Sequence, residues 1–427
     1  MIGAGIFTTS GLLMTDLQSP LLMMGLWLLG GLIALCGALS YGELGAAMPR
    51  AGGEYLFLSR LYHPSIGFLS GWVSFFVGFS APIAASAIGF SDYLGRAFPG
   101  LLQPGLLPPS IEALVIKKGI SLLVILGFTL IHIRGIVFGS RVQNLLTILK
   151  VLLMTAIIGI GFAWGRGGFS HLSAGHYTSG GSPDLKTMGL SLMWIMFAYS
   201  GWNAAAYIGS EIKEARRNLP RSLLIGTGMV IILYLLLNLF YLYAIPPGQW
   251  TREISVAGRA VGISLGPALG GVISLMVALA LFSSLSAFII LGPRVYYAMA
   301  RNGHFFRFAG QIHPRFQVPV KSIILQGLIA GTMVLLGTFD QVLTYMGFSL
   351  TIFPLLSVAG VFRLRRLGQS VHKARGYPLV QVFFILMGSG ILILAFIQRP
   401  VESGIALATV AAGIPFFWMF ARNRREE

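Results

Sequence analysis

Two short segments of small residues carry the chemistry that this sequence suggests. They are Gly3-Ala4-Gly5 and the stretch FAYSGWN at 197–203, and each lies inside an apolar run. Backbone that is not helical leaves its amide and carbonyl groups without partners. At membrane depth this is tolerated only where the backbone is buried in protein or lines a cavity. Two interrupted helices at matching places in two halves of a chain are typical of a binding site between structural repeats. Packing between helices is the alternative interpretation of these glycines.

Lys150 lies within another apolar run, QNLLTILKVLLMTAIIGIGF. A charged side chain inside a membrane span indicates a functional role. The alternative is that the lysine, about two helical turns from the end of the span, extends its ammonium to the interface.

Residues for enzyme chemistry are missing, since the sequence has no Walker-type phosphate loop and no cluster of metal ligands. We therefore expect no enzyme activity, no cofactor and no metal.

The composition requires membrane-spanning helices to position these residues. Of the 427 residues, 56% are hydrophobic and only 10% are charged, whereas soluble domains carry about 25% charged residues. The net charge of +17 does not indicate nucleic acid binding, because the basic residues gather in short loops between apolar runs, as orientation in a membrane requires. The single cysteine, Cys36, rules out an internal disulfide.

Eleven apolar runs are long enough for full membrane spans. They are 20–48, 66–97, 118–134, 145–164, 186–210, 222–245, 267–292, 321–338, 342–362, 379–398 and 402–421. Basic residues near 213–221, 301–321, 363–375 and 422–425 then fall on one side, which predicts a cytoplasmic C-terminus. The short mixed stretch 49–64 predicts an amphipathic segment in the interface.

The first residues form an additional apolar segment that is too short to cross a bilayer. Eleven crossings from a cytoplasmic C-terminus place residues 16–20 outside and Met1 near the middle of the membrane. We therefore expect a first helix that is truncated at its cytoplasmic half, and a natural protein that begins upstream of this Met1.

Several motifs resemble the amino acid–polyamine–organocation superfamily. GAGIF at 3–7 and YGELGAAMPRAGGEYLFL at 41–58 carry this resemblance. Three further motifs are similar to its L-type amino-acid transporter branch. They are FAYSGWN continuing into GSEIKEARRNLPRSLLIG at 209–226, GPRVYYAMARNGHF at 292–305 and RPVESGIAL at 399–407. The resemblance implies an all-α polytopic membrane protein with a five-plus-five inverted-repeat (LeuT-like) transporter fold. Residues 1–427 would form one transporter domain, composed of a first repeat at 1–164, a second at 186–362 and two extra C-terminal helices within 379–421.

The resemblance also implies a site for a free amino acid between the two broken helices. The amides of Gly3, Ala4 and Gly5 would receive its carboxylate at the positive end of a helix. Its ammonium would be bound by backbone carbonyls, those of Met1 or Ile2 and of Phe197, Ala198 and Ser200.

Three side chains of the second segment receive further roles from the resemblance. Phe197 would cover the substrate as an outer gate, with ordinary core packing as the alternative. Ser200 would narrow the pocket toward modest side chains. Asn203 would bridge the broken helix to its neighbours, or else make one ordinary polar contact.

In sodium-independent members of the family, a lysine at the place of Lys150 puts an ammonium where sodium-coupled members bind the ion. The resemblance therefore implies that Lys150 replaces a cation. The facing hydroxyls would be Ser283, Ser284 and Ser286, unless these serines bond only carbonyls of their own helix.

These observations predict a sodium-independent secondary transporter that carries or exchanges neutral L-amino acids across the cell membrane by alternating access. One alternative is a proton-coupled or antiporting permease for basic amino acids or polyamines, although the two broken segments offer such a substrate no acidic side chain. Another is a receptor, a scaffold or a truncated product that does not transport.

The predicted partners are the amino acid substrate and the lipid bilayer, without nucleic acid. Eukaryotic members of the L-type branch form a disulfide to a partner from an outer loop, but the outer loop 98–117 has no cysteine. We therefore expect no disulfide-linked heavy chain and a monomer or a weak homo-oligomer.

Overall fold

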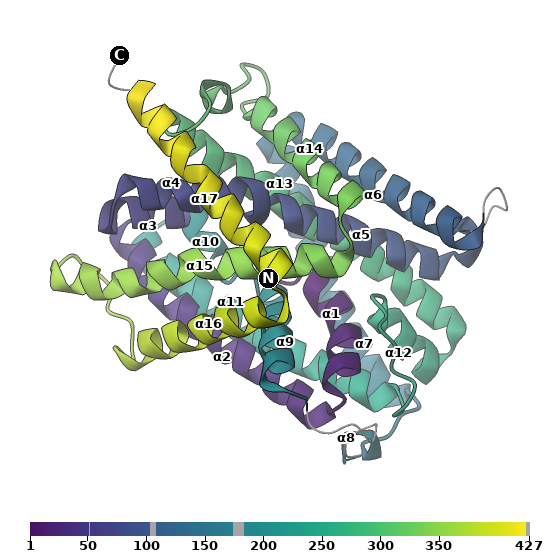
Figure 1. Ribbon diagram of the computed structural model, residues 1–427. Coiled ribbons are helices and arrows are strands. Elements are labelled where there is room, and N and C mark those ends of the chain that lie inside the picture. Colours follow the sequence, from purple (N-terminus) through teal and green to yellow (C-terminus); the bar gives the residue numbers. More distant parts are fainter. Residues whose placement is uncertain (51, 103–107, 174–182, 424–427) are drawn as a thin grey trace.

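The computed structural model describes residues 1–50, 52–102, 108–173 and 183–423, and throughout these ranges its regular elements are helices (Figure 1). Nine helical segments within them are long and apolar enough to cross a membrane, so the chain is a polytopic all-α membrane protein. These segments are α2 (Pro20–Ala47), α4 to α5 (Pro64–Ala97), α6 (Pro109–Ile133), α7 (Ile136–Trp164), α11 (Ala215–Ala244), α13 (Pro267–Arg301), α15 (Phe339–Arg366), α16 (Leu379–Gln398) and α17 (Pro400–Asn423).

Shorter elements complete the bundle. The helices among them are α1 (Ala4–Leu17), α3 (Gly53–Leu61), α8 (Ser170–Ser173), α9 (Leu185–Ala198), α10 (Ala204–Tyr207), α12 (Val256–Leu265) and α14 (Val320–Leu336). The span from α4 (Pro64–Val73) to α5 (Ser80–Ala97) contains a π-helical turn, η1 (Ser74–Gly78), and 3₁₀ turns lie at η2 (Pro99–Leu102), η3 (Gly209–Glu211) and η4 (Arg307–Gly310).

The structure departs from the eleven predicted spans at two places. The run at 186–210 is helical only as α9, which has 14 residues and ends at Ala198, and the run at 321–338 forms α14, which has 17 residues. Both are apolar but shorter than an ordinary full span. Hydropathy therefore located the apolar segments, but it did not show where the backbone stops being helical.

The stretch 49–64 packs against the protein, and its place in the membrane interface stays a prediction. It contains α3, and six of the nine residues of α3 are buried against the rest of the protein. α3 packs on α4 and α15 and also contacts α10. A segment that looks amphipathic in the sequence is therefore part of the protein interior.

The two segments singled out in the sequence lie beside each other, because α1 packs along α9 near the middle of the bundle (Figure 1). Their closest approach is at Gly5, where an added Cβ would lie 2.4 Å from the Cα of Ala198. Around them α2 packs on α11, and α5 packs on α13. The inverted-repeat relation between the two halves stays a prediction.

Local signals explain where several helices begin. Pro20 is the first residue of α2, and the hydroxyl of Ser19 accepts a hydrogen bond from the amide of Leu22. The start of α15 is a capping box, in which Thr338 and Gln341 bond each other's backbone amides. By contrast, α1 begins after Gly3, which has no side chain to cap its first turn.

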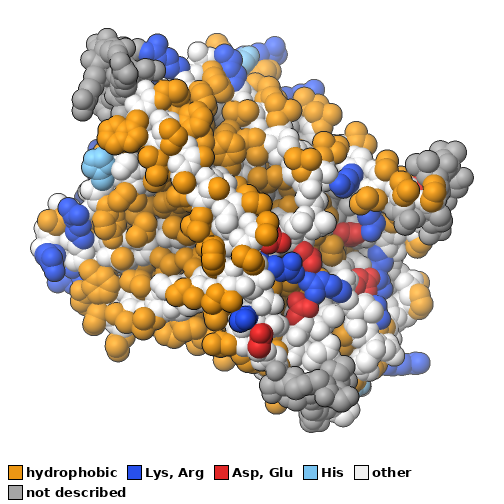
Figure 2. All heavy atoms as spheres, viewed as in Figure 1, with side chains coloured by type: hydrophobic (Ala, Val, Ile, Leu, Met, Phe, Trp, Pro, Cys, Tyr) orange, Lys and Arg blue, Asp and Glu red, His pale blue; other side chains and the backbone are white. Residues whose placement is uncertain are grey.

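The surface combines broad apolar areas with local clusters of charge (Figure 2). Large hydrophobic side chains are exposed along α6, α7 and α11, as expected of helices that face lipid. Arg252 forms ion pairs with Asp16 at 2.5 Å and with Asp340 at 2.9 Å. Because Asp16 lies near the end of α1 and Asp340 near the start of α15, Arg252 joins these two helix ends.

Another ion pair joins α2 to α15 and is mostly buried. The carboxylate of Glu43, on α2, accepts two hydrogen bonds of 2.7 Å from the guanidinium of Arg365, on α15. It also accepts from the hydroxyl of Ser370 at 2.7 Å and from the amide of Ala374 at 2.9 Å. Glu43 has no exposed surface, so this pair fixes the loop after α15 against α2.

Candidate substrate site

The two broken segments meet at a cavity of about 400 Å³. On one side α1 begins at Ala4 after the extended residue Gly3. On the other side α9 ends at Ala198, and helical structure resumes only at Ala204. Gly201, between them, has a φ of +86°, a left-handed conformation that glycine adopts without strain.

Most of the predicted site residues line this cavity. They are Met1, Ile2, Gly3, Ala4, Gly5, Lys150, Phe197, Ala198, Ser200, Ser283 and Ser284. The cavity wall is mainly apolar, and the residues that form it include no aspartate or glutamate. The first turn of α1 has amide groups without a side-chain cap at this place, and a helix N-terminus favours an anionic group.

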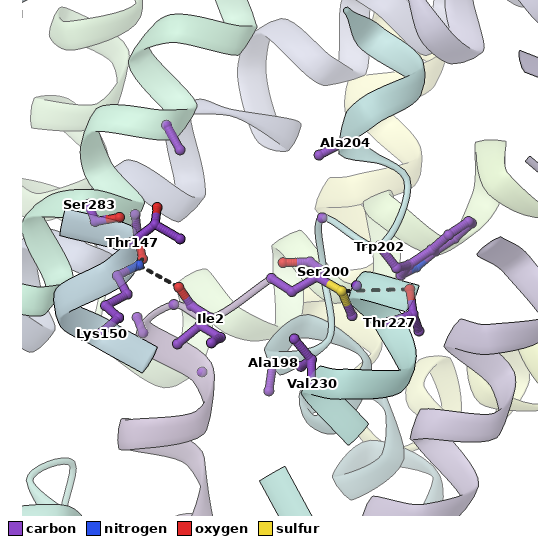
Figure 3. A pocket seen from close by; sticks show the side chains of 18 of the residues that line it. Ile2, Thr147, Lys150, Ala198, Ser200, Trp202, Ala204, Thr227, Val230 and Ser283 are labelled. Atoms are coloured by element: carbon purple, nitrogen blue, oxygen red, sulfur yellow. Dashed lines mark hydrogen bonds between the residues drawn. The ribbon is translucent and has the colours of Figure 1, made fainter. Parts of the chain in front are cut away.

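Lys150 projects from α7 into the wall of this cavity (Figure 3). Its ammonium donates a hydrogen bond to the carbonyl of Ile2 and another, of 3.0 Å, to the hydroxyl of Ser284 on α13. Only 3% of the residue is exposed. The ammonium therefore does not reach toward the interface. It joins α7 and α13 to the backbone that precedes α1.

Tyr234, on α11, belongs to the site although the sequence did not point to it. Its hydroxyl lies 3.0 Å from the carbonyl of Met1 and 3.0 Å from that of Ala198, so one proton is shared between the two broken segments. Thr227 lies on the same face of α11, about two turns before Tyr234. It lines the cavity and contacts the sulfur of Met1 (Figure 3). Asn238 on the same face accepts a hydrogen bond from Ser10 of α1. The spacing of Thr227, Tyr234 and Asn238 along one face was the available signal.

Asn203 and Ser286 do not line this cavity. Asn203 donates a 2.8 Å hydrogen bond to the carboxylate of Glu54, on α3. It therefore bridges the broken segment to a neighbouring element, at a second cavity of about 80 Å³ that also borders Phe197 and Ser200. Ser286 lies 3.1 Å from the ring of His132, on α6, instead of facing Lys150.

Comparisons with known proteins identify the family to which the chain is similar. A sequence model of the amino acid permease family matches residues 1–420. The chain is 26% identical to the human Asc-type amino acid transporter 1 over 98% of this chain and 79% of the relative. It is 28% identical to the mouse large neutral amino acids transporter small subunit 2, over 98% and 78% of the two chains. It is also 27% identical to the mouse b(0,+)-type amino acid transporter 1, over 98% and 85%. These relatives are transporters and not enzymes, and they confirm the resemblance to the L-type branch.

Proposed function

Because the chain belongs to the amino acid permease family, we propose that it is a sodium-independent carrier or exchanger of neutral L-amino acids that works by alternating access. The carboxylate of the substrate binds the amides of the first turn of α1, and its ammonium binds carbonyls of the two broken segments. A zwitterion needs donors and acceptors that face each other, and the cavity offers both. Its mainly apolar wall suits an uncharged side chain.

The observation that carries this proposal is the position of the Lys150 ammonium. It bonds a carbonyl of the first broken segment and a hydroxyl of α13, at the edge of the cavity. A fixed ammonium between these groups supplies the positive charge that a bound sodium ion would otherwise supply, and it repels a second cation. Transport then needs no sodium.

We place the protein in the cell membrane, with the basic loops and the C-terminus in the cytoplasm. Cys36, the single cysteine of the sequence, is half-buried in α2. No disulfide to a partner is therefore formed from the outer loop 98–117. We propose a carrier that works alone or as a weak homo-oligomer.

Counterflow in proteoliposomes tests the proposal. Vesicles loaded with one neutral amino acid should accumulate the same labelled amino acid, with or without sodium. A panel of unlabelled neutral, basic and acidic amino acids as competitors identifies the substrate class. Phe197→Ala, which removes a ring from the cavity wall, should weaken transport without removing the protein from the membrane. Absence of exchange with every amino acid, or a strict need for sodium, would contradict the proposal.

A further inference from the structure

Glu54 is a buried carboxylate that has no role in the transport function proposed above. It lies on α3 and is only 5% exposed. One of its oxygens, Oε1, accepts three hydrogen bonds: from the hydroxyl of Tyr41 at 2.9 Å, from that of Tyr207 at 3.0 Å and from the amide nitrogen of Asn203 at 2.8 Å. Within the described part of the chain, no lysine or arginine forms an ion pair with it. A buried carboxylate without a cation is costly unless it is hydrogen-bonded or takes up a proton.

Glu54 is placed where its charge acts on the second broken helix. Two of its three donors, Asn203 and Tyr207, belong to the segment that follows the break. This segment contains α10, a helix of only four residues, so its position depends on such contacts. Hydrogen bonds to an ionised carboxylate are about twice as strong as neutral ones. An ionised Glu54 therefore holds α10 more firmly than a protonated one.

The cavity beside this carboxylate has room for water. Glu54 lines the second cavity, whose 80 Å³ holds a few water molecules, since one water needs about 10–15 Å³. Ser200, Gly201, Trp202 and Ala204 line this cavity and the substrate cavity alike. On the far side the second cavity borders η1, a π-helical turn of the kind that occurs often at functional sites.

The surroundings favour the uptake of a proton over that of another cation. Tyr41 from α2 and Tyr207 from α10 are the titratable groups that face Glu54, and Glu54 and Tyr207 are the ionisable residues that line the cavity. The elements η1, α9, α13, α15 and α16, together with Phe79, contribute small, apolar or hydroxyl side chains to the same wall. A site with one carboxylate offers too few oxygen ligands for a metal ion. Burial raises the pKa of the Glu54 carboxyl above its ordinary value, and the hydrogen bonds from Tyr41, Tyr207 and Asn203 offset only part of this effect.

We propose that Glu54 is a proton-binding site that controls how firmly α10 is held, and thereby makes the transport rate depend on pH. The proposal rests on the proposed function. A hydronium ion in the cavity transfers its proton to the carboxylate, so one O–H bond forms on Glu54 and one breaks in hydronium, which leaves water. The neutral acid holds Asn203 and Tyr207 less strongly. The segment around α10 then moves more easily, and exchange becomes faster as the pH falls.

Counterflow measured between about pH 5 and about pH 8 tests this coupling. We expect the wild-type rate to fall at least about fivefold as the pH rises, because the protonated fraction of one carboxyl falls about tenfold for each pH unit above its pKa. Glu54→Gln, a permanently neutral analogue, should give a fast rate that changes less than about twofold over this range. The matched control is Glu211→Gln, which removes a half-exposed carboxylate just after α10 and should keep the wild-type profile. A flat wild-type profile, or a wild-type profile in Glu54→Gln, would overturn the proposal.

Tyr207→Phe provides a second test if Glu54→Gln does not fold. Loss of one donor to the carboxylate destabilises its ionised form, so the midpoint of the pH profile should move up by about one unit. An unmoved midpoint contradicts the proposal. If Glu54→Gln instead changes which amino acids compete while the pH profile stays that of the wild type, the carboxylate contacts substrate and the proposal is wrong.

Infrared spectroscopy of the purified protein separates this proposal from the transport function. The C=O band of a protonated carboxyl should appear as the pH falls, and Glu54→Gln should lack it. This measurement needs no transported substrate, so it stays decisive even if no amino acid is exchanged. An identical set of titrating bands in both proteins would overturn the assignment of the proton to Glu54.

Discussion

The hydroxyl of Tyr234 touches both broken segments, through the carbonyls of Met1 and Ala198. We expect Tyr234→Phe to lower the counterflow rate about fivefold, because a hydrogen bond of this kind contributes about 1 kcal/mol. The ring would keep its edge contact with Trp27 and its tilted contact with Tyr199, so the melting temperature should change little. Rates in proteoliposomes and thermal unfolding in detergent would measure the two effects.

Tyr241 offers the matched control for this variant. It lies on the same helix, is equally buried, and its hydroxyl has no hydrogen-bond partner among the residues that the structure describes. Tyr241→Phe should therefore leave both transport and stability as they are. Equal losses in the two variants would mean that the Tyr234 hydroxyl has no special place in the site.

Lys150 permits a prediction about ion dependence. Lys150→Ala removes the ammonium that bonds the Ile2 carbonyl and the Ser284 hydroxyl, and charged hydrogen bonds of this kind contribute about 1.5–3 kcal/mol. We expect transport to fall by at least about tenfold, and to differ between the two membrane sides. The exposed lysine Lys321, bonded to Gln311 in a loop, is the control, and Lys321→Ala should transport normally. Full activity of Lys150→Ala would refute its role in place of a cation.

How far the sequence could predict the site differs from residue to residue. Gly3, Gly5 and Lys150 were accessible, because a small-residue break and a charge are both unusual within an apolar run. Tyr234 and Glu54 were not, since tyrosines are common in this chain and Glu54 lies in a stretch that resembles an interfacial segment. Ser286 has the right residue type and helix, but its register directs it to His132.

At the level of elements, the Glu43–Arg365 pair connects α2, α15 and the loop that follows α15. Removing one partner of a buried ion pair leaves the other charge uncompensated, which costs about 3–5 kcal/mol. We therefore expect Glu43→Gln to lower the midpoint of thermal unfolding markedly in detergent. Glu402→Gln should change it little, because Glu402 contacts Arg399 at the longer distance of 3.6 Å, only three residues away in the chain, and the Arg399 side chain is 38% exposed. Similar midpoints for the two variants would show that the buried pair does not stabilise the protein.

The elements themselves were predicted well where length and hydropathy decide, as in α2, α11 and α16. Prediction was weaker where tertiary contacts decide. The small residues at 197–203 indicated an interruption, but they did not show that α9 ends at Ala198, beside the cavity and the neighbouring α1. Likewise, α3 is buried because α4 and α15 cover it, which no periodicity within 49–64 reveals.

At the scale of the whole molecule, Arg252 links the end of α1 to the start of α15, and the proposed orientation puts this link on the outer face. We expect that opening the cavity toward this face breaks both ion pairs, each worth about 0.2–1 kcal/mol. Arg252→Ala should therefore lower the half-saturating external concentration of substrate, by up to about thirtyfold. Uptake by cells that express the variant would measure it.

Arg399→Ala is the control for this effect. The Arg399 side chain is as exposed as that of Arg252, but its ion pair is with Glu402, three residues further along the chain at the junction of α16 and α17, and does not connect α1 to α15. It should leave the half-saturating concentration unchanged. A higher half-saturating concentration in Arg252→Ala would mean that the arginine attracts substrate instead of holding this face closed.

The contact between Gly5 and Ala198 also has an evolutionary consequence. The two residues are far apart in the chain, yet an added Cβ on Gly5 would fall 2.4 Å from the Cα of Ala198. A side chain at position 5 cannot be accommodated by a smaller side chain at position 198, because the nearest atom is the backbone Cα of residue 198. We expect natural variation among permeases to be absent at position 5 and restricted to small residues at position 198. Divergence in substrate preference must then arise elsewhere around the cavity, where side chains and not backbone form the wall.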